Sequence, residues 1–258
     1  MDTELLGTVQ QFLEEKVRMY NRTEFIRDDP IQVPHQFHRQ ENIEIAAFLT
    51  ATIAWGRRDT IIRNAFDLIS RMDHNPYEFL MNLKKDDLKV FNGFKHRTFN
   101  DQDCHFFIWS LHDMYKNKGG MYPIFLAGYN ESRSIKHAIQ GFREIFFGTK
   151  HSLRTEKHLA NPLAGSAAKR LNMFLRWMAR KDENGVDFGI WDAISPADLY
   201  LPLDVHTGNV ARKLGLLNRK QNDWKAVEEL TAVLKDFDPS DPVKYDFALF
   251  GLGIFENY

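Results

Sequence analysis

Apolar residues recur every three or four positions along almost the whole 258-residue chain, and this period most constrains its fold. It is the pattern of amphipathic helices, and no stretch sustains the two-residue alternation of half-buried strands. We therefore expect an all-α protein with few strands. The segment 43–55 is apolar on almost all sides, which predicts a central, buried helix. Late in the chain, helices are predicted at about 166–180, 207–216, 223–236 and 243–255.

Breaks in this pattern indicate two helical layers within a single unit, residues 1–258. One layer is a helical body at about 20–150, and the other comprises 151–258 together with the N-terminal helix. The longest late break, 181–203, is rich in Asp, Gly and Pro. Near the start of the body, Asp59 is predicted to be the N-cap of the helix that follows it.

Composition excludes several classes of protein. Hydrophobic residues make up 43% and charged residues 27%, as in ordinary globular domains, and no apolar run is long enough to span a membrane. Cys104 is the only cysteine, which rules out an intrachain disulfide and a cysteine-ligated zinc or iron–sulfur site. The net charge of −1 argues against a uniformly basic surface but leaves room for a local basic face. We expect a cytoplasmic monomer with no membrane partner.

The first stretch that carries chemistry is Leu163–Leu175. Here Gly165 makes a tight turn that opens a helix, and Lys169 lies in the first turns of that helix. A helix start offers unpaired backbone N–H groups and the positive end of the helix dipole, both of which suit a phosphate.

The second stretch is Leu201–Leu216, in which Asp204 stands directly before a helix. That helix ends with Arg212 and Lys213, followed by a glycine cap. An aspartate in this position is usually an N-cap, and Asp204 can cap through the N–H of Thr207.

Together the two stretches resemble the helix-hairpin-helix DNA glycosylases, the superfamily of endonuclease III and the 8-oxoguanine glycosylases. The segment 163–169, Leu-Ala-Gly-Ser-Ala-Ala-Lys, is similar to the family's hairpin Leu-Pro-Gly-Val-Gly-x-Lys, with Asn172 also in register. Residues 202–206, Pro-Leu-Asp-Val-His, are similar to the Pro-Val-Asp-Thr-His that holds the family's catalytic carboxylate. The segment 213–216, Lys-Leu-Gly-Leu, is close to the Arg-Leu-Gly-Leu that follows in many members.

Weaker likenesses at 48–52 and 246–253 extend the resemblance over roughly residues 40–255, and three departures qualify it. First, 34 residues separate Lys169 from Asp204, a long gap that the archaeal 8-oxoguanine glycosylases share. Second, Ala167 stands where the hairpin has its second glycine. Third, no cysteine cluster follows, so the iron–sulfur cluster of the endonuclease III branch is absent.

The resemblance implies a two-layer helix-hairpin-helix glycosylase fold and a base-excision enzyme with AP lyase activity. Lys169 would attack the sugar C1′ and form a Schiff base, as amines do with carbonyl carbons. Asp204 would stabilise the cationic sugar or act as an acid–base partner. The implied partner is double-stranded DNA containing a damaged base, with an oxidised purine such as 8-oxoguanine as the expected substrate. Neither a metal nor an organic cofactor is needed.

DNA contacts are expected from the hairpin and from residues that adjoin the motifs. These residues are Gly165, Ser166, Ala167, Arg170, Thr52, His206, Arg212 and Lys213. The target base must leave the duplex, so a pocket with aromatic walls is implied. The candidate wall residues are Trp55, Trp109, Phe174, Trp177 and Trp191.

Two other functions remain open from the sequence. The chain could be a non-catalytic nucleic-acid-binding module that keeps the fold. It could also be an unrelated helical enzyme that acts on a small molecule through His105, His112 and Asp113, which fall on one helical face. These histidines lack further cysteine or histidine neighbours, so we expect no metal site there.

Overall fold

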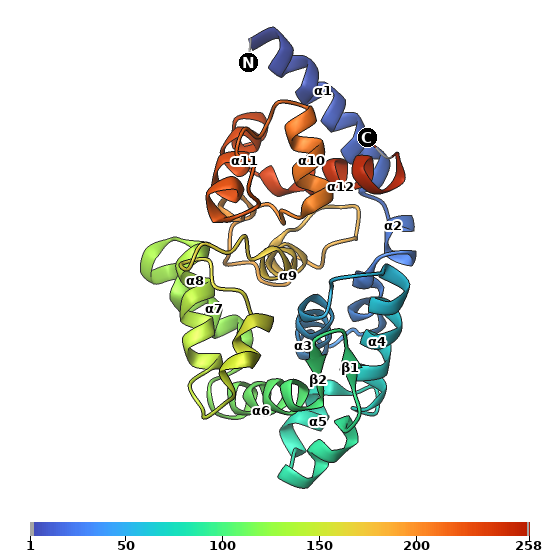
Figure 1. Cartoon of the computed structure of the whole chain (residues 1–258), viewed down its shortest axis with the longest axis vertical. Coiled ribbons are helices and arrows are strands. Elements are labelled where there is room, and N and C mark those ends of the chain that lie inside the picture. Colours follow the sequence, from blue (N-terminus) through green and yellow to red (C-terminus); the bar gives the residue numbers. More distant parts are fainter. Residues whose placement is uncertain (1–2, 257) are drawn as a thin grey trace. The chain divides into compact units, whose positions relative to one another are not determined.

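The computed structural model describes residues 3–256 and 258, and the regular secondary structure of these residues is almost all helical (Figure 1). The predicted all-α class is confirmed. The β-sheet in this part of the chain consists of two short antiparallel strands, β1 Lys95–His96 and β2 Phe99–Asn100. No helix in it is both long and apolar enough to cross a membrane.

The chain divides into two compact units. Unit 1 comprises residues up to Phe25 together with Asn161–Tyr258, and unit 2 comprises Ile26–Ala160. The N-terminal helix therefore belongs with the C-terminal part of the chain. The sequence had placed these divisions at about residues 20 and 150.

Unit 1 carries both stretches singled out in the sequence, and the late helices predicted at 207–216, 223–236 and 243–255 are confirmed to within three residues at each end. Its described α-helices are α1 Thr3–Tyr20, α9 Lys169–Ala179, α10 Val205–Lys213, α11 Trp224–Phe237 and α12 Tyr245–Phe255, with 3₁₀ turns at Pro196–Asp198 and Pro242–Lys244. The short helix α2, Glu24–Arg27, spans the boundary with unit 2.

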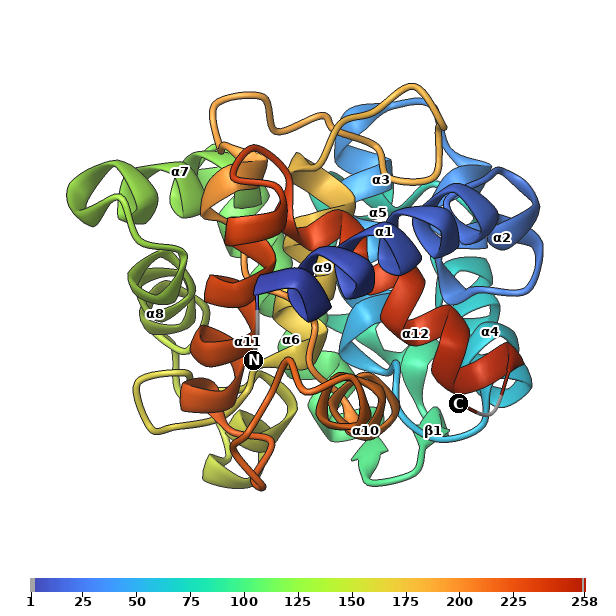
Figure 2. The same ribbon diagram turned by 90° about the horizontal axis from the view of Figure 1, so that it is seen from above.

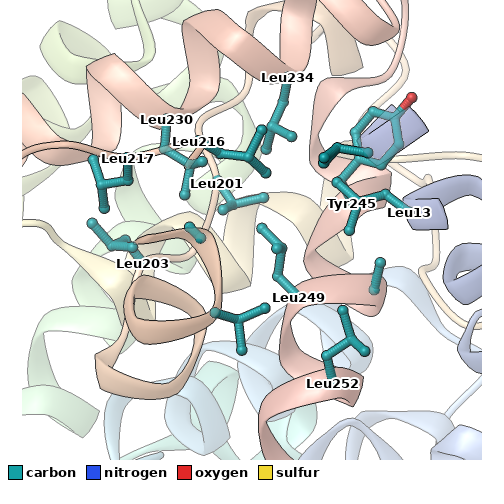
Figure 3. Packing of buried hydrophobic residues seen from close by; sticks show 14 of the residues in the cluster. Leu13, Leu201, Leu203, Leu216, Leu217, Leu230, Leu234, Tyr245, Leu249 and Leu252 are labelled. Atoms are coloured by element: carbon teal, nitrogen blue, oxygen red, sulfur yellow. The ribbon is translucent and has the colours of Figure 1, made fainter. Parts of the chain in front are cut away.

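Helix α12 is the centre of unit 1 and packs against both α1 and α10; Figure 2 shows α1 crossing it. Two glycines permit these close approaches. A Cβ atom on Gly251 would lie 2.2 Å from Cδ2 of Tyr20, and one on Gly253 would lie 3.1 Å from Cβ of His206. Around this crossing, leucines from α1, α11, α12 and the loops flanking α10 form an apolar core (Figure 3).

Unit 2 is built around α3, whose residues from Asn42 to Thr52 are all buried, which confirms the predicted central helix. Its core is aromatic: the Phe48 ring packs against the rings of Phe107, Phe142 and Phe146. Its α-helices are α3 Gln40–Thr52, α4 Arg58–Ser70, α5 Pro76–Asn82, α6 Asp101–Asn117, α7 Met121–Ser132 and α8 Ile135–Phe146, with 3₁₀ turns at Pro30–Gln32, Pro34–Gln36, Lys85–Phe91 and Leu153–His158.

The N-cap predicted at Asp59 is wrong. Helix α4 begins at Arg58, Arg57 occupies the cap position, and Asp59 lies within the first turn. Its carboxylate instead pairs with Nη2 of Arg57 at 3.0 Å. An acidic residue is favoured by the helix dipole in the first turn as well as at the cap, so composition alone does not separate the two positions.

Candidate active site

The loop of residues 161–168 sets where the lysine-bearing helix begins. The helix predicted at about 166–180 is α9, which begins three residues later than predicted, at Lys169 itself. Gly165 has a φ of +90° and Ala168 a φ of +46°, and these left-handed conformations keep the preceding residues out of the helix. Ala167, which aligns with the second glycine of the glycosylase hairpin, does not adopt a positive φ, so an alanine fits there.

The backbone N–H groups of this loop are largely used within it. Those of Leu163 and Ala164 donate to Oδ1 of Asn161 at 2.9 and 3.2 Å. The N–H groups of residues 165 and 166 donate to backbone carbonyls, and that of residue 168 donates to a serine hydroxyl. The N–H of Lys169 has no acceptor among the described residues. A phosphate held here would therefore be bound mainly by the first turn of α9 rather than by the loop.

The loop has an α-helix only on its C-terminal side. Residues 147–168 contain the 3₁₀ helix Leu153–His158 and no α-helix. The first helix of a helix-hairpin-helix motif is thus not formed directly before this loop. Pro162 and the side chain of Asn161, which accepts bonds from the next turn, favour a turn at this point.

Lys169 is half-buried at the first position of α9, and its Nζ lies 3.5 Å from Sδ of Met173, one turn further on. Its ammonium makes no ion pair with a carboxylate of the described residues. The amine is therefore held against an apolar thioether, without a direct ionic partner.

Asp204 is the N-cap of α10, as its position before the helix predicts. Its Oδ1 accepts a hydrogen bond from the N–H of Thr207 at 2.9 Å. The other carboxylate oxygen, Oδ2, accepts no hydrogen bond from the described residues. The backbone carbonyl of Asp204 accepts a bond from Nδ2 of Asn222 at 2.9 Å. One oxygen thus holds the helix start while the other remains available for chemistry.

A second acidic group, Asp246 in the first turn of α12, lies in the same candidate site, and the sequence analysis does not name it as a functional residue. It is buried, and its carboxylate bonds to Nη1 of Arg176 on α9. Burial raises the pKa of the Asp246 carboxyl to about 6, and the Arg176 guanidinium works against that rise. The charge of Asp204 raises it further, and the charge of Lys169 lowers it. Lys169 and Asp204, 34 residues apart, therefore lie within electrostatic range of one buried carboxyl.

A signal for Asp246 is present in the sequence. Helix α12 reads Tyr-Asp-Phe-Ala-Leu-Phe-Gly-Leu-Gly-Ile-Phe, so Asp246 is its one charged side chain and the other residues are almost all apolar. A carboxylate in such a helix is buried only with a partner, which makes it worth tracing.

The segment returning from α9 to Asp204 is anchored by a buried ionic network. Nε of Arg176 lies 3.2 Å from Oδ1 of Asp187, and Nη1 of Arg180 lies 3.0 Å from its Oδ2. Arg180 also pairs with Asp241 at 2.9 Å. Asp187 therefore serves as an anchor for this segment. Removing one partner from such a network leaves a buried charge unpaired, which is strongly destabilising.

The residues expected to contact DNA have different environments. Gly165, Ser166, His206 and Lys213 are exposed, whereas Ala167 is half-buried. Arg170 is half-buried, and burial lowers the pKa of its guanidinium to about 10. Thr52 is buried at the end of α3 and belongs to unit 2, unlike the others.

Arg212, also expected to contact phosphate, is used within the protein. Its Nε donates to the carbonyl of Arg219 at 2.8 Å, and its Nη2 donates to Oδ1 of Asn222 at 2.6 Å. Among the candidate wall residues, Phe174, Trp177 and Trp191 are fully buried in unit 1, while Trp55 and Trp109 in unit 2 are partly exposed.

The histidines of α6 are not arranged as a second site. Nδ1 of His112 lies 2.6 Å from the carbonyl of Leu80, and the Asp113 carboxylate accepts a bond from Asn117 at 2.7 Å. These contacts tie α6 to α5 and to its own last turn. No group of three or more His, Cys, Asp or Glu side chains suited to a metal ion occurs in the described part of the chain.

The environment of Asp246 predicts a specific pH dependence of stability. Because its pKa rises from 3.8 unfolded to about 6 folded, the native state binds this proton more tightly. The contribution to the free energy of unfolding is then present at acidic pH and lost as the pH rises through 6. Relative to the parent, Asp246→Asn should gain roughly 3 kcal/mol between pH 3.5 and pH 7, measured by denaturant unfolding.

Asp238 supplies a control, because the pKa of its carboxyl is shifted in the opposite direction from that of Asp246. Burial raises the pKa of its carboxyl, but hydrogen bonds from Lys244 and Ser240 outweigh burial and lower it. Asp238→Asn should therefore lose stability relative to the parent as the pH rises. An Asp246→Asn difference that is flat or falls with pH would contradict the assigned environment.

Comparison with known proteins identifies a family for this chain. Residues 29–255 match the model of a family described as a protein of unknown function, DUF2400, and the chain belongs to that family. No curated protein and no solved structure matches the chain.

Proposed function

We propose that this member of the DUF2400 family is a DNA glycosylase with AP lyase activity that acts on a damaged base, an oxidised purine such as 8-oxoguanine, in double-stranded DNA. One observation carries the proposal. A lysine amine without an ionic partner among the described residues and an aspartate with one uncommitted oxygen both lie within electrostatic range of the buried carboxyl of Asp246. The motif resemblance at 163–169 and 202–206 supports the same chemistry.

In the proposed reaction Lys169 is the nucleophile. Its free amine attacks C1′ of the damaged nucleotide, forming a C–N bond as the glycosidic bond breaks, and the base leaves with the electron pair and takes up a proton. Opening of the sugar ring gives a Schiff base. Loss of a proton from C2′ then expels the 3′ phosphate, and water releases the lysine.

Asp204 is the proposed electrostatic partner. Positive charge develops on the sugar as the base leaves, and a fixed carboxylate oxygen stabilises it without reorganisation. Oδ1 is held by the N–H of Thr207, which fixes the carboxylate, and Oδ2 is then free to face the sugar.

Borohydride trapping tests the proposal, because it reduces the Schiff base to a stable covalent adduct. We expect an adduct with duplexes that contain 8-oxoguanine or an abasic site, and none with the undamaged duplex. Strand cleavage should accompany it in the absence of borohydride. Binding to lesion duplexes without any adduct or cleavage would identify a non-catalytic binding module instead. Absence of both binding and adduct would overturn the DNA assignment.

A further inference from the structure

The segment 218–224, which leads from α10 into the first residue of α11, contacts the backbone of Asp204 and the backbone of the loop that precedes Lys169. Nδ2 of Asn222 donates to the backbone carbonyl of Asp204 at 2.9 Å. The next residue, Asp223, forms an antiparallel bridge with Ser166, and the N–H of Trp224 donates to the carbonyl of Gly165 at 2.9 Å. Consecutive residues thus hold Asp204 and the loop that leads into Lys169.

Asn222 is itself held firmly. Its Oδ1 accepts a 2.6 Å bond from Nη2 of Arg212, whose Nε is bonded to the carbonyl of Arg219. A charged donor makes such a bond stronger than a neutral one. Gly208 leaves the space for this arrangement, since a Cβ atom there would lie 2.8 Å from both Nη1 of Arg212 and Oδ1 of Asn222.

We propose that Asn222 is a positioning residue, which fixes the Asp204 carboxylate relative to Lys169 by holding the carbonyl of Asp204. The inference rests on the proposed function, because it assigns Asn222 a part in the same reaction. Misplacing a catalytic group by about 1 Å costs up to roughly 100-fold in rate, so one lost tether at the cap has a measurable effect.

Asn222→Asp is the diagnostic substitution. It keeps an oxygen for Arg212 and so keeps the segment anchored, but it removes the side-chain donor to the Asp204 carbonyl. That carbonyl then keeps the N–H of Gly208, within α10, as its donor. We expect the single-turnover rate of strand cleavage at saturating lesion duplex to fall about 10- to 100-fold. The Kd for the duplex and the melting temperature should stay close to those of the parent.

Asn218→Asp is the matched control. Asn218 lies in the same segment and is exposed, and its backbone N–H donates to Oε1 of Glu229 at 2.7 Å, while its side chain has no hydrogen bond to the described residues. This variant should cleave at the rate of the parent.

A double-mutant cycle separates positioning from a general structural role. If Asn222 acts through Asp204, Asn222→Asp should slow the Asp204→Asn protein little further. A parent rate in Asn222→Asp, or an effect that is fully additive with Asp204→Asn, would overturn this inference while leaving the proposed function intact. A parent protein that forms no adduct and cleaves no lesion duplex would overturn both.

Discussion

Lys169→Gln should abolish covalent trapping by borohydride and strand cleavage, while binding to a lesion duplex survives. Glutamine has a similar reach but no nucleophilic amine, so no Schiff base can form. Among the described residues the Lys169 ammonium bonds to Sδ of Met173 and joins no ion pair, so its replacement should cost little stability. Adduct formation, single-turnover cleavage and the melting temperature are the measurements.

Lys225→Gln is the control for this result. Lys225 is an exposed lysine on α11 of the same unit and lies outside the cluster around Asp246. The Lys225→Gln variant should form borohydride adducts at the rate of the parent. A Lys169→Gln protein that still forms an adduct would show that a different amine is the nucleophile.

Asp204→Asn should slow cleavage about 100- to 1,000-fold, equivalent to roughly 3–4 kcal/mol of lost transition-state stabilisation. Asparagine keeps the shape and can still accept the N–H of Thr207 through its side-chain oxygen, so α10 retains its cap. The negative charge opposite the developing sugar cation is lost. We therefore expect a large change in rate with a small change in melting temperature.

Asp101→Asn controls for a change of charge at a helix start. Asp101 lies at the start of α6 in unit 2, and its carboxylate accepts the N–H groups of Gly93 and Gln102. The Asp101→Asn variant should cleave the lesion duplex at the rate of the parent. An Asp204→Asn protein that melts far below the parent yet cleaves at the parent rate would make Asp204 a structural cap only. Another carboxylate would then have to be sought, and Asp187, in the segment 181–203 that leads back to Asp204, is already bound by Arg176 and Arg180.

Much of the fold follows from local pattern. The period of apolar residues predicted α10, α11 and α12 closely, because a helix that buries one face must repeat its apolar residues at that period. The same pattern identified α3 as central, since its residues are apolar on almost every side. The candidate pair Lys169 and Asp204 came from short motifs, whose chemistry is readable in the order of residues.

Local pattern does not settle details that depend on backbone conformation or on hydrogen bonding. The start of α9 depends on positive φ angles at Gly165 and Ala168, and an alanine gives no sequence signal for that conformation. The sequence analysis expects Arg212 to contact phosphate because it is a basic residue beside a motif. A basic residue in that position looks the same in the sequence whether its side chain binds DNA or a carbonyl of the protein. Only the structure showed its bonds to Arg219 and Asn222.

The sequence by itself determined that this chain is helical, where its late helices lie and which lysine and aspartate are candidates for chemistry, because these properties reside in neighbouring residues. Tertiary structure alone decided what surrounds them. Arg176 meets Asp246 across 70 positions, and Asn222 meets Asp204 across 18, so no periodicity or motif relates the partners. Folding brings α9 and α10 to α12 and removes Asp246 from water, and this burial raises the pKa of its carboxyl.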